Sequence, residues 1–211
     1  MENYKKSLRK KYNNKTKRIN LKNLFKSKTF WENVAIVFIA ILLFVGLRLT
    51  IQSSVVDGPS MENTFLNGER VLVDKLAYKF GAPQRGDVII FHPPISSTSP
   101  FIKRIIGLPG ERVEIENGTV TVAKPDGSMI ILNEPYIRES PNYDYTSAII
   151  PPNEYFVMGD NRNDSEDSHY GWFVSRDEVI GKAWLCIWPP HEWGLAENYR
   201  QPAALKTTIG N

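Results

Sequence analysis

The hydrophobic and polar positions divide the chain into one continuous apolar segment near the N-terminus and a longer part of alternating character. Residues 34–47 contain no polar side chain, and large apolar residues extend this character from Phe30 to Ile51. As a helix, residues 34–47 rise only about 21 Å, whereas the hydrocarbon core of a bilayer is about 30 Å thick. The longer segment can cross the bilayer if Arg48 extends its charge to the interface. The pattern therefore predicts one transmembrane anchor over residues 29–51.

The alternating part of the chain predicts a mainly β fold. Short runs of β-branched and aromatic residues are broken by Gly, Pro and Asn, which is typical of strands and turns, and no long helical period follows the anchor. We expect an antiparallel β-sheet domain with long loops over residues 52–195. Proline and glycine are frequent in the segment of about residues 116–153, which we expect to form a small inserted β lobe. Residues 196–211 are expected to form a C-terminal tail.

The charge is unevenly distributed, although the whole chain carries only +3. Residues 1–28 contain eleven Lys and Arg residues and one Glu, a net charge of +10, and the remainder carries −7. Positive residues beside a transmembrane helix mark its cytoplasmic side. We therefore expect a single-pass protein of the cell membrane, with a basic cytoplasmic tail that contacts anionic lipid and a domain outside the cytoplasm.

Two alternatives for this N-terminal region remain open. A basic tail by itself is also compatible with nucleic-acid binding, although the apolar segment behind it favours the membrane, so we expect no nucleic-acid partner. An apolar run of this length also fits the core of a cleaved secretion signal, although the preceding basic region is long for one.

A predicted strand at residues 101–107, "FIKRIIG", holds two cations whose side chains should lie on opposite faces. Each of Lys103 and Arg104 is flanked on its own face by large apolar residues. A buried arginine stays charged, whereas a buried lysine has a lowered pKa and can act as a neutral base near pH 7. The alternative is a half-exposed strand whose lysine simply reaches water.

Two loop segments carry groups that can act together with such a lysine. In "DGPSMENTF", Ser60 follows a Gly-Pro turn, but the G-x-S-x-G pattern of a nucleophile elbow is absent. Ser60 is thus either a turn residue or a nucleophile whose base is not histidine. Residues 159–171, "GDNRNDSEDSHYG", are rich in side chains that cap backbone amides in turns. They form either a solvated loop or a buried ion-pair network, and they lack the Gly and Glu of a calcium loop.

The single cysteine restricts the chemistry further. One cysteine excludes an intrachain disulfide and any CxxC metal site. Cys186 lies in the apolar run "KAWLCIWPP", which predicts a packed core thiol in a strand. The three histidines form no HExxH pattern, and nothing in their spacing supports a Ser/His/Asp triad. We therefore expect no metal site.

Four segments that follow the anchor resemble, in their order, the motifs of the type I signal peptidase family: "GPSMENTF", "RGDVIIF", "FIKRIIGLPGERV" and "GDNRNDSEDSHYGWF". The similarity covers roughly residues 30–190. It implies a membrane-anchored serine endopeptidase with a β-rich catalytic domain, which releases signal peptides from translocated preproteins without a metal or organic cofactor. The implied partners are signal peptides of secretory preproteins, membrane lipid and, by proximity, the secretion translocon.

The same resemblance assigns roles to individual residues. Ser60 is implied to be the nucleophile and Lys103 the general base of a Ser/Lys dyad. Ser165 matches a serine that orients the lysine amine, and Asp160 and Asp167 match acids that support the last motif. These roles agree with the chemistry of the residues, because a serine hydroxyl needs a positioned base to remove its proton.

The resemblance also concerns the oxyanion and the substrate pockets. Gly58 stands where some relatives have a hydroxyl residue, so a contact from this position to the oxyanion has to come from the backbone. Pockets for small side chains at one and three positions before the cut are implied at the apolar residues Val56, Met61, Phe65 and Ile102.

The sequence departs from the family pattern at two positions. Asn63 stands where relatives usually have Pro, which we expect to loosen the turn after the nucleophile. His169 stands where relatives usually have an Arg that pairs with the acid matched by Asp167. A histidine can replace the charge of an arginine only while it is protonated.

Three other kinds of protein remain as alternatives. Self-cleaving repressors also use a Ser/Lys pair, but the apolar segment and the lack of a DNA-binding region count against them. A sortase-like transpeptidase shares the anchor and the β domain but requires a nucleophilic cysteine, for which Cys186 is poorly placed. An anchored β domain that binds a partner without catalysis would not need the serine and lysine.

Overall fold

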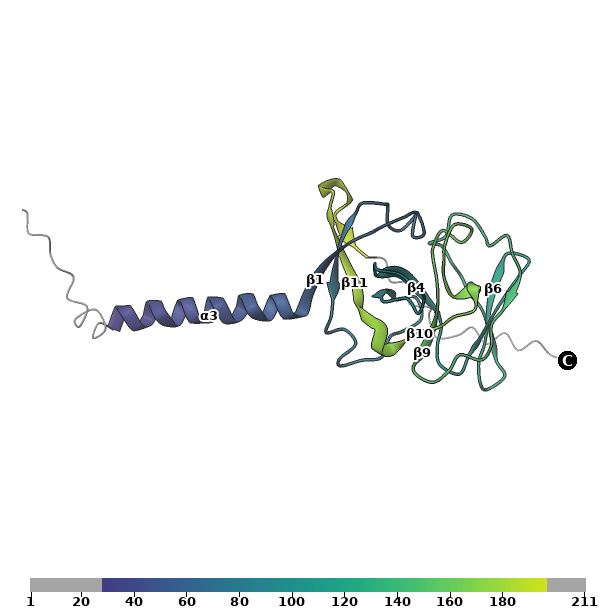
Figure 1. Ribbon diagram of the computed structural model, residues 1–211, viewed down its shortest axis with the longest axis horizontal. Helices are drawn as coiled ribbons and strands as arrows, with labels where there is room; N and C mark the ends of the chain where they lie inside the picture. Colours follow the sequence, from purple (N-terminus) through teal and green to yellow (C-terminus); the bar gives the residue numbers. More distant parts are fainter. Residues whose placement is uncertain (1–27, 197–211) are drawn as a thin grey trace, which may run out of the picture. The chain divides into compact units, whose positions relative to one another are not determined.

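The computed structural model describes residues 28–196, which form an N-terminal helix and a β-rich domain (Figure 1). The expected basic tail and C-terminal tail lie outside the described residues, except for Lys28 and Ala196. The helix α3 comprises Lys28–Thr50. The strand β1 follows it directly, so Ile51 belongs to the sheet rather than to the helix.

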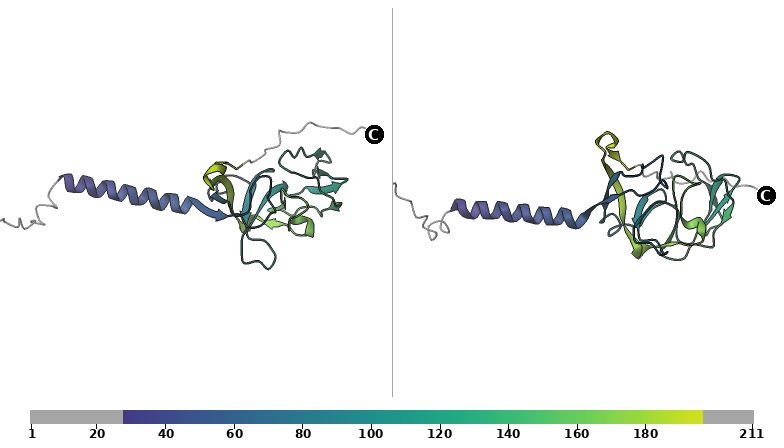
Figure 2. Two further views of the ribbon diagram at one scale, coloured as in Figure 1. Left: turned by 90° about the horizontal axis from the view of Figure 1, so that it is seen from above. Right: turned by 45° about the horizontal axis from the view of Figure 1, so that its top comes forward.

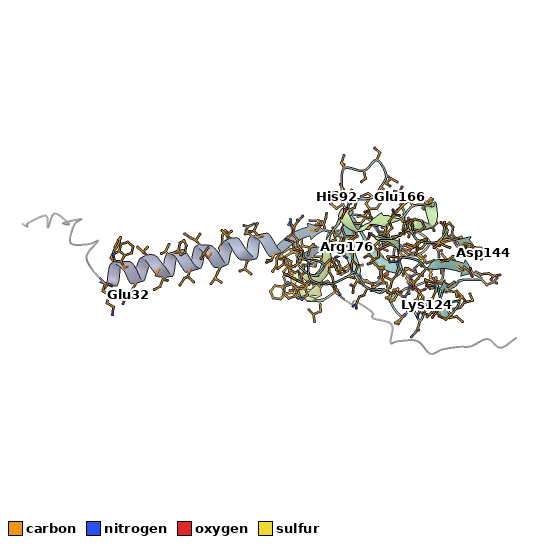
Figure 3. The ribbon with its side chains drawn as sticks, turned by 90° about the horizontal axis from the view of Figure 1, so that it is seen from below. Glu32, His92, Lys124, Asp144, Glu166 and Arg176 are labelled. Carbon is orange, nitrogen blue, oxygen red and sulfur yellow. The ribbon has the colours of Figure 1, made fainter. Side chains whose placement is uncertain are left out.

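Helix α3 is apolar on every side. Its 23 residues rise about 34 Å, which is enough to cross a hydrocarbon core of about 30 Å. None of its residues is buried in the protein, and Figure 3 shows side chains that project from it in all directions. Within residues 28–196, it is the one helix that is long and apolar enough to span a membrane.

The larger sheet of the β domain has eight strands. Seven of them follow the order β1-β2-β11-β3-β4-β9-β10, and β12 pairs with β11. Every pairing in this sheet is antiparallel. The strands are β1 (Ile51–Val55), β2 (Arg70–Asp74), β3 (Val88–Phe91), β4 (Phe101–Gly107), β9 (Glu154–Met158), β10 (Val174–Ser175), β11 (Val179–Trp188) and β12 (Gly194–Leu195).

A smaller antiparallel sheet has the strand order β7-β6-β5-β8. The views in Figures 1 and 2 agree that it lies at the end of the β domain away from β1 and β11. It includes β5, which lies ahead of the segment expected to form the inserted lobe. Its strands are β5 (Arg112–Glu116), β6 (Thr119–Ala123), β7 (Met129–Ile131) and β8 (Tyr145–Thr146). Three short 3₁₀ helices complete the described elements: η1 (Ser168–Tyr170), η2 (Arg176–Glu178) and η3 (Pro190–Glu192).

Three clusters of buried apolar side chains fill the β domain. Strand β4 lies between β3 and β9 and contributes to all three, through Ile102, Ile106 and Ile105. Since apolar side chains cover both of its faces, β4 is buried along nearly its whole length. The mainly antiparallel β fold behind one apolar helix is thus confirmed, and β4 forms its centre.

Candidate active site

Ser60 lies in a tight turn between β1 and β2. The amide of Glu62 donates to the carbonyl of Pro59 at 2.9 Å, and the amide of Phe65 donates to that of Met61 at 2.8 Å. The Ser60 carbonyl accepts from the amide of Asn161 at 3.0 Å, which ties the turn to the loop after β9. These bonds hold the Ser60 side chain on a defined backbone.

Lys103 brings its amine to this serine from the centre of β4. Its Nζ lies 2.5 Å from Ser60 Oγ, although the two residues are 43 positions apart in the sequence. Only 4% of Lys103 is exposed. Its aliphatic stem is covered because β4 is packed on both faces, so the alternative of a half-exposed lysine is wrong. Both cations of the strand are buried, because Arg104 on the other face is completely inaccessible to solvent.

Burial changes the acidity of this amine. Desolvation lowers the pKa of Lys103 from its ordinary value to about 8, while the negative charges of Asp167, Glu166 and Asp160 act in the opposite direction. None of these carboxylates lies close enough to form an ion pair with Lys103 among the described contacts. A substantial fraction of neutral amine therefore exists at mildly alkaline pH, and this form accepts a proton.

The charge of the neighbouring Arg104 is compensated by an acid. Arg104 makes a bidentate ion pair with Asp160, at 2.8 Å from Nε and 2.6 Å from Nη2, and both side chains are fully buried. The hydroxyl of Thr64 also donates to Asp160, at 2.5 Å. Asp160 thus joins β4 to the Ser60 turn. These bonds agree with a buried ion-pair network, one of the two interpretations of residues 159–171.

Asp167 organises the loop that carries Ser165. One carboxylate oxygen accepts from the Ser165 hydroxyl at 2.6 Å and from the Gly159 amide at 2.9 Å. The expected bond from Ser165 to the Lys103 amine does not occur in the described structure. A Cβ on Gly159 would lie 2.3 Å from Ser165 Oγ and 2.4 Å from the Ser60 carbonyl oxygen. Ser165 is therefore packed next to the Ser60 turn.

His169 takes the position expected for an arginine and does pair with the acid. Its Nδ1 lies 2.7 Å from Asp167 Oδ1, and its amide donates to the same oxygen at 3.2 Å. The ring stacks on Tyr143 with the centroids 4.5 Å apart. An imidazole with a proton on Nδ1 can donate this bond in its neutral as well as its protonated form.

The Gly58 amide is already occupied. It donates to the side chain of Asn67 at 3.0 Å, and the positive φ of +87° at this position favours glycine. In contrast, the amide of Ser60 makes no hydrogen bond with any described residue. Ser60 N–H is thus a backbone donor that remains available near Ser60 Oγ, whereas the Gly58 amide is used within the turn.

An open cleft of about 270 Å³ lies beside the serine and the lysine. Of the four expected wall residues, Val56 and Ile102 line it, together with Val71 and Ile90. Met61 and Phe65 do not line this cleft but pack into the hydrophobic core below the turn. Three acidic residues, Asp57, Asp164 and Glu166, also line the cleft, and Glu166 is exposed (Figure 3).

Sequence reasoning missed a tyrosine and an acid that support this site from the smaller sheet. Tyr136 and Glu134 lie in the segment between β7 and β8. The Arg104 guanidinium lies 4.0 Å from the centroid of the Tyr136 ring, and Glu134 makes a bidentate ion pair with Arg162 at 2.7 and 2.6 Å. Glu134 and Arg162 are 28 positions apart in the sequence, so no local pattern indicates their contact.

Two other kinds of site considered from the sequence are a reactive cysteine and a metal site. Cys186 is buried in β11, and burial raises the pKa of its thiol, as expected of a packed core residue rather than a nucleophile. Within residues 28–196, no group of three or more His, Cys, Asp or Glu side chains is arranged to hold a metal ion. A serine next to a buried lysine of lowered pKa, at an open cleft, is the arrangement of a serine hydrolase that uses a lysine as its base.

Comparisons with known proteins agree with this class. Residues 30–188 match the family "Signal peptidase, peptidase S26". The chain is 39% identical to the probable signal peptidase I-1 of Synechocystis sp., over 77% of this chain and 85% of that protein. It is 31% identical to signal peptidase IB of Staphylococcus aureus, over 76% and 89%. A crystal structure of a signal peptidase I from Enterococcus faecalis is 34% identical, with a TM-score of 0.42, over 48% of this chain and 97% of that one.

The chain therefore belongs to the signal peptidase family, peptidase S26. It is a serine endopeptidase of a membrane-anchored family, and the described apolar helix agrees with this. This membership excludes the alternatives of a self-cleaving repressor and a sortase-like enzyme.

Proposed function

We propose that the chain cleaves signal peptides from preproteins through Ser60 as nucleophile and Lys103 as general base. The observation that carries this proposal is the 2.5 Å separation of Ser60 Oγ and a buried lysine Nζ beside an open cleft. Family membership supports the substrate class, since signal peptidases act on preproteins that carry signal peptides.

The chemistry proceeds in two halves. Ser60 Oγ attacks the carbonyl carbon of the scissile peptide bond, and its proton passes to the neutral amine of Lys103. The negative charge on the carbonyl oxygen is stabilised by the amide of Ser60. The tetrahedral intermediate expels the amine of the mature protein, which takes the proton from the lysine ammonium, and the signal peptide remains as an ester on Ser60.

Water completes the reaction. Lys103 accepts a proton from water, which attacks the ester carbonyl, and the ammonium then returns this proton to Ser60 as the signal peptide leaves. Ser165, Asp160 and Asp167 have supporting roles. Asp160 holds Arg104, the neighbour of Lys103 in β4. Asp167 binds the Ser165 hydroxyl and the Gly159 amide and so holds the loop after β9 next to the Ser60 turn. The cleft residues Val56 and Ile102 offer an apolar wall to the residues before the cut.

The membrane arrangement is part of the proposal. Helix α3 serves as a single anchor, with residues 1–28 in the cytoplasm and the β domain outside it, because the eleven cations precede the helix. The basic tail contacts anionic lipid, and the enzyme works close to the secretion translocon from which its substrates emerge. The arrangement allows a preprotein to be cut at the membrane surface without removal of its apolar segment from the bilayer.

A preprotein assay with the detergent-solubilised full chain tests this function. Ser60→Ala should reduce the cleavage rate by several orders of magnitude, because it removes the attacking oxygen, whereas folding should not change. Thermal unfolding of both proteins provides the control for folding. Cleavage by Ser60→Ala within tenfold of the wild type would rule out Ser60 as the nucleophile. A folded wild type that binds but does not cut the preprotein would favour a binding domain.

A further inference from the structure

The turn that carries Ser60 has an unusual residue three positions after the serine. Asn63 has a φ of +90° and is the third residue of a β-turn that is closed by the Thr64 amide and the Met61 carbonyl at 3.0 Å. Glycine and asparagine accept a positive φ at this position, whereas the proline ring fixes φ near −65°. The turn therefore has a backbone that proline cannot adopt, and the expectation that Asn63 merely loosens it needs revision.

The side chain of Asn63 forms a bond across the domain. Its Nδ2 donates to the backbone carbonyl of Tyr136 at 2.7 Å, a partner 73 residues away. Tyr136 belongs to the segment between β7 and β8 of the smaller sheet, and only 4% of it is exposed. A partly buried amide-to-carbonyl bond of this length fixes the position of the turn relative to that segment.

Tyr136 also contacts the strand that carries the base. The Arg104 guanidinium lies 4.0 Å from the centroid of its ring, and Arg104 follows Lys103 directly in β4. The Tyr136 hydroxyl donates to Glu134 at 2.9 Å, and Glu134 in turn is paired with Arg162. The carbonyl of Tyr136 therefore meets the serine turn while its ring meets the lysine strand.

From this arrangement we infer that Asn63 is a positioning residue, which holds the Ser60 turn in register with Lys103 through the carbonyl of Tyr136. The inference rests on the proposed function of the dyad. Asn63 does not line the cleft beside Ser60, so it acts through the backbone of the turn and not on the substrate. Other bonds also hold the turn, including that from Thr64 to Asp160, so loss of the Asn63 amide weakens the alignment without abolishing it.

Asn63→Gly is the direct test, because glycine accepts the same φ and removes only the side-chain amide. With the solubilised full chain and a preprotein substrate, we expect kcat to fall about tenfold while KM stays within about twofold, since misalignment of reacting groups affects the chemical step. Asn63→Asp keeps the shape and the tolerance for positive φ but cannot donate when ionised, and it should show at least the same loss.

Asn117→Gly provides a matched control. Asn117 also has a positive φ, of +50°, but it is exposed in the hairpin between β5 and β6, and its side chain makes no hydrogen bond with any described residue. This variant should keep the kcat of the wild type. Thermal unfolding of all variants shows whether a change in kcat occurs in folded protein at the assay temperature.

The outcomes separate the inference from the function on which it rests. Wild-type kcat in folded Asn63→Gly or Asn63→Asp would overturn the inference, and so would an equal loss in Asn117→Gly. A raised KM with unchanged kcat would make Asn63 a substrate contact and would also overturn it. In all these cases the wild type still cleaves the preprotein, whereas failure of the proposed function is seen as wild-type cleavage that does not depend on Ser60.

Discussion

At the scale of single residues, Lys103 and Arg104 are adjacent cations that the fold treats in opposite ways. Arg104 remains charged and is compensated by Asp160 at 2.8 and 2.6 Å. Lys103 has no such partner, and burial lowers its pKa to about 8. A buried charge without a partner is costly, so the amine loses its proton more easily than an exposed lysine does. Of the two cations, only Lys103 is therefore able to act as a base, which is the role proposed for it.

Glu166 provides a test of this electrostatic balance. It lines the cleft, and its negative charge raises the pKa of Lys103 against the effect of burial. Glu166→Gln removes a negative charge that stabilises the ammonium form of Lys103, so the pH at which kcat/KM rises should decrease. The expected decrease is a few tenths of a pH unit, because solvent screens an exposed charge. The measurement is the pH profile of kcat/KM for a preprotein.

Glu116→Gln is the control for Glu166→Gln, because Glu116 is also exposed but lies at the end of β5 in the smaller sheet. Its profile should coincide with that of the wild type. A shift of the Glu166→Gln profile toward higher pH, or equal shifts in both variants, would contradict the electrostatic account.

At the scale of elements, the dyad depends on the loop after β9, which passes close to the Ser60 turn. The amide of Asn161 donates to the Ser60 carbonyl, and Gly159 leaves room for both that carbonyl and the Ser165 hydroxyl. Neither the loop nor the turn is a regular element. Their mutual position is set by hydrogen bonds and by the absence of a side chain at one point.

Gly159→Ala should therefore disturb the site strongly. The new Cβ would lie 2.4 Å from the Ser60 carbonyl oxygen, which is backbone and cannot move without the turn. We expect kcat to fall at least about 100-fold, since a displacement of about 1 Å has that effect on aligned groups. Gly81→Ala is the control, because its Cβ would make an ordinary contact of 3.5 Å with the Ala77 carbonyl oxygen. Comparable activity of the two variants would show that the loop adjusts freely.

The elements themselves were largely predictable, whereas their contacts were not. The pattern of apolar and turn residues predicted strands that correspond to β4 and β11, because a β-rich run between Gly and Pro has few other conformations. The sequence left open whether the faces of β4 are buried or half exposed. Both faces are buried, because β4 lies between β3 and β9 and contributes to three core clusters. The local pattern of residues could not predict this, since it does not encode the order of strands in the sheet.

Within the candidate site, the motif residues were found from the sequence but some of their contacts were not. Ser60 and Lys103 do meet, yet the Ser165 hydroxyl bonds to Asp167 rather than to the lysine. The contribution of Tyr136 had no sequence signal, because a tyrosine in a proline-rich loop is ordinary by composition. Its role depends on contacts between segments that are far apart in the chain.

At the scale of the whole molecule, the asymmetry of charge and hydrophobicity predicts how the chain is oriented. The eleven cations of residues 1–28 precede α3, whereas Arg48 is the basic residue of its last turn. By the positive-inside rule, the β domain should lie outside the cytoplasm. In intact spheroplasts, protease added outside should degrade the β domain and leave an epitope tag at the N-terminus protected. A protected β domain that becomes sensitive only after lysis would contradict both the orientation and the proposed access to translocated preproteins.

The central claim is that a neutral Lys103 takes the proton of Ser60. The most direct measurement is the pH dependence of kcat/KM for preprotein cleavage, compared between the wild type and Lys103→Arg. The wild-type rate should rise with pH, be half-maximal near pH 8 and level off about one pH unit higher, as the amine loses its proton. Lys103→Arg should be inactive at every pH, because the guanidinium keeps its charge and cannot accept a proton. A flat wild-type profile from about pH 5 to 9, or an active Lys103→Arg enzyme, would contradict the account.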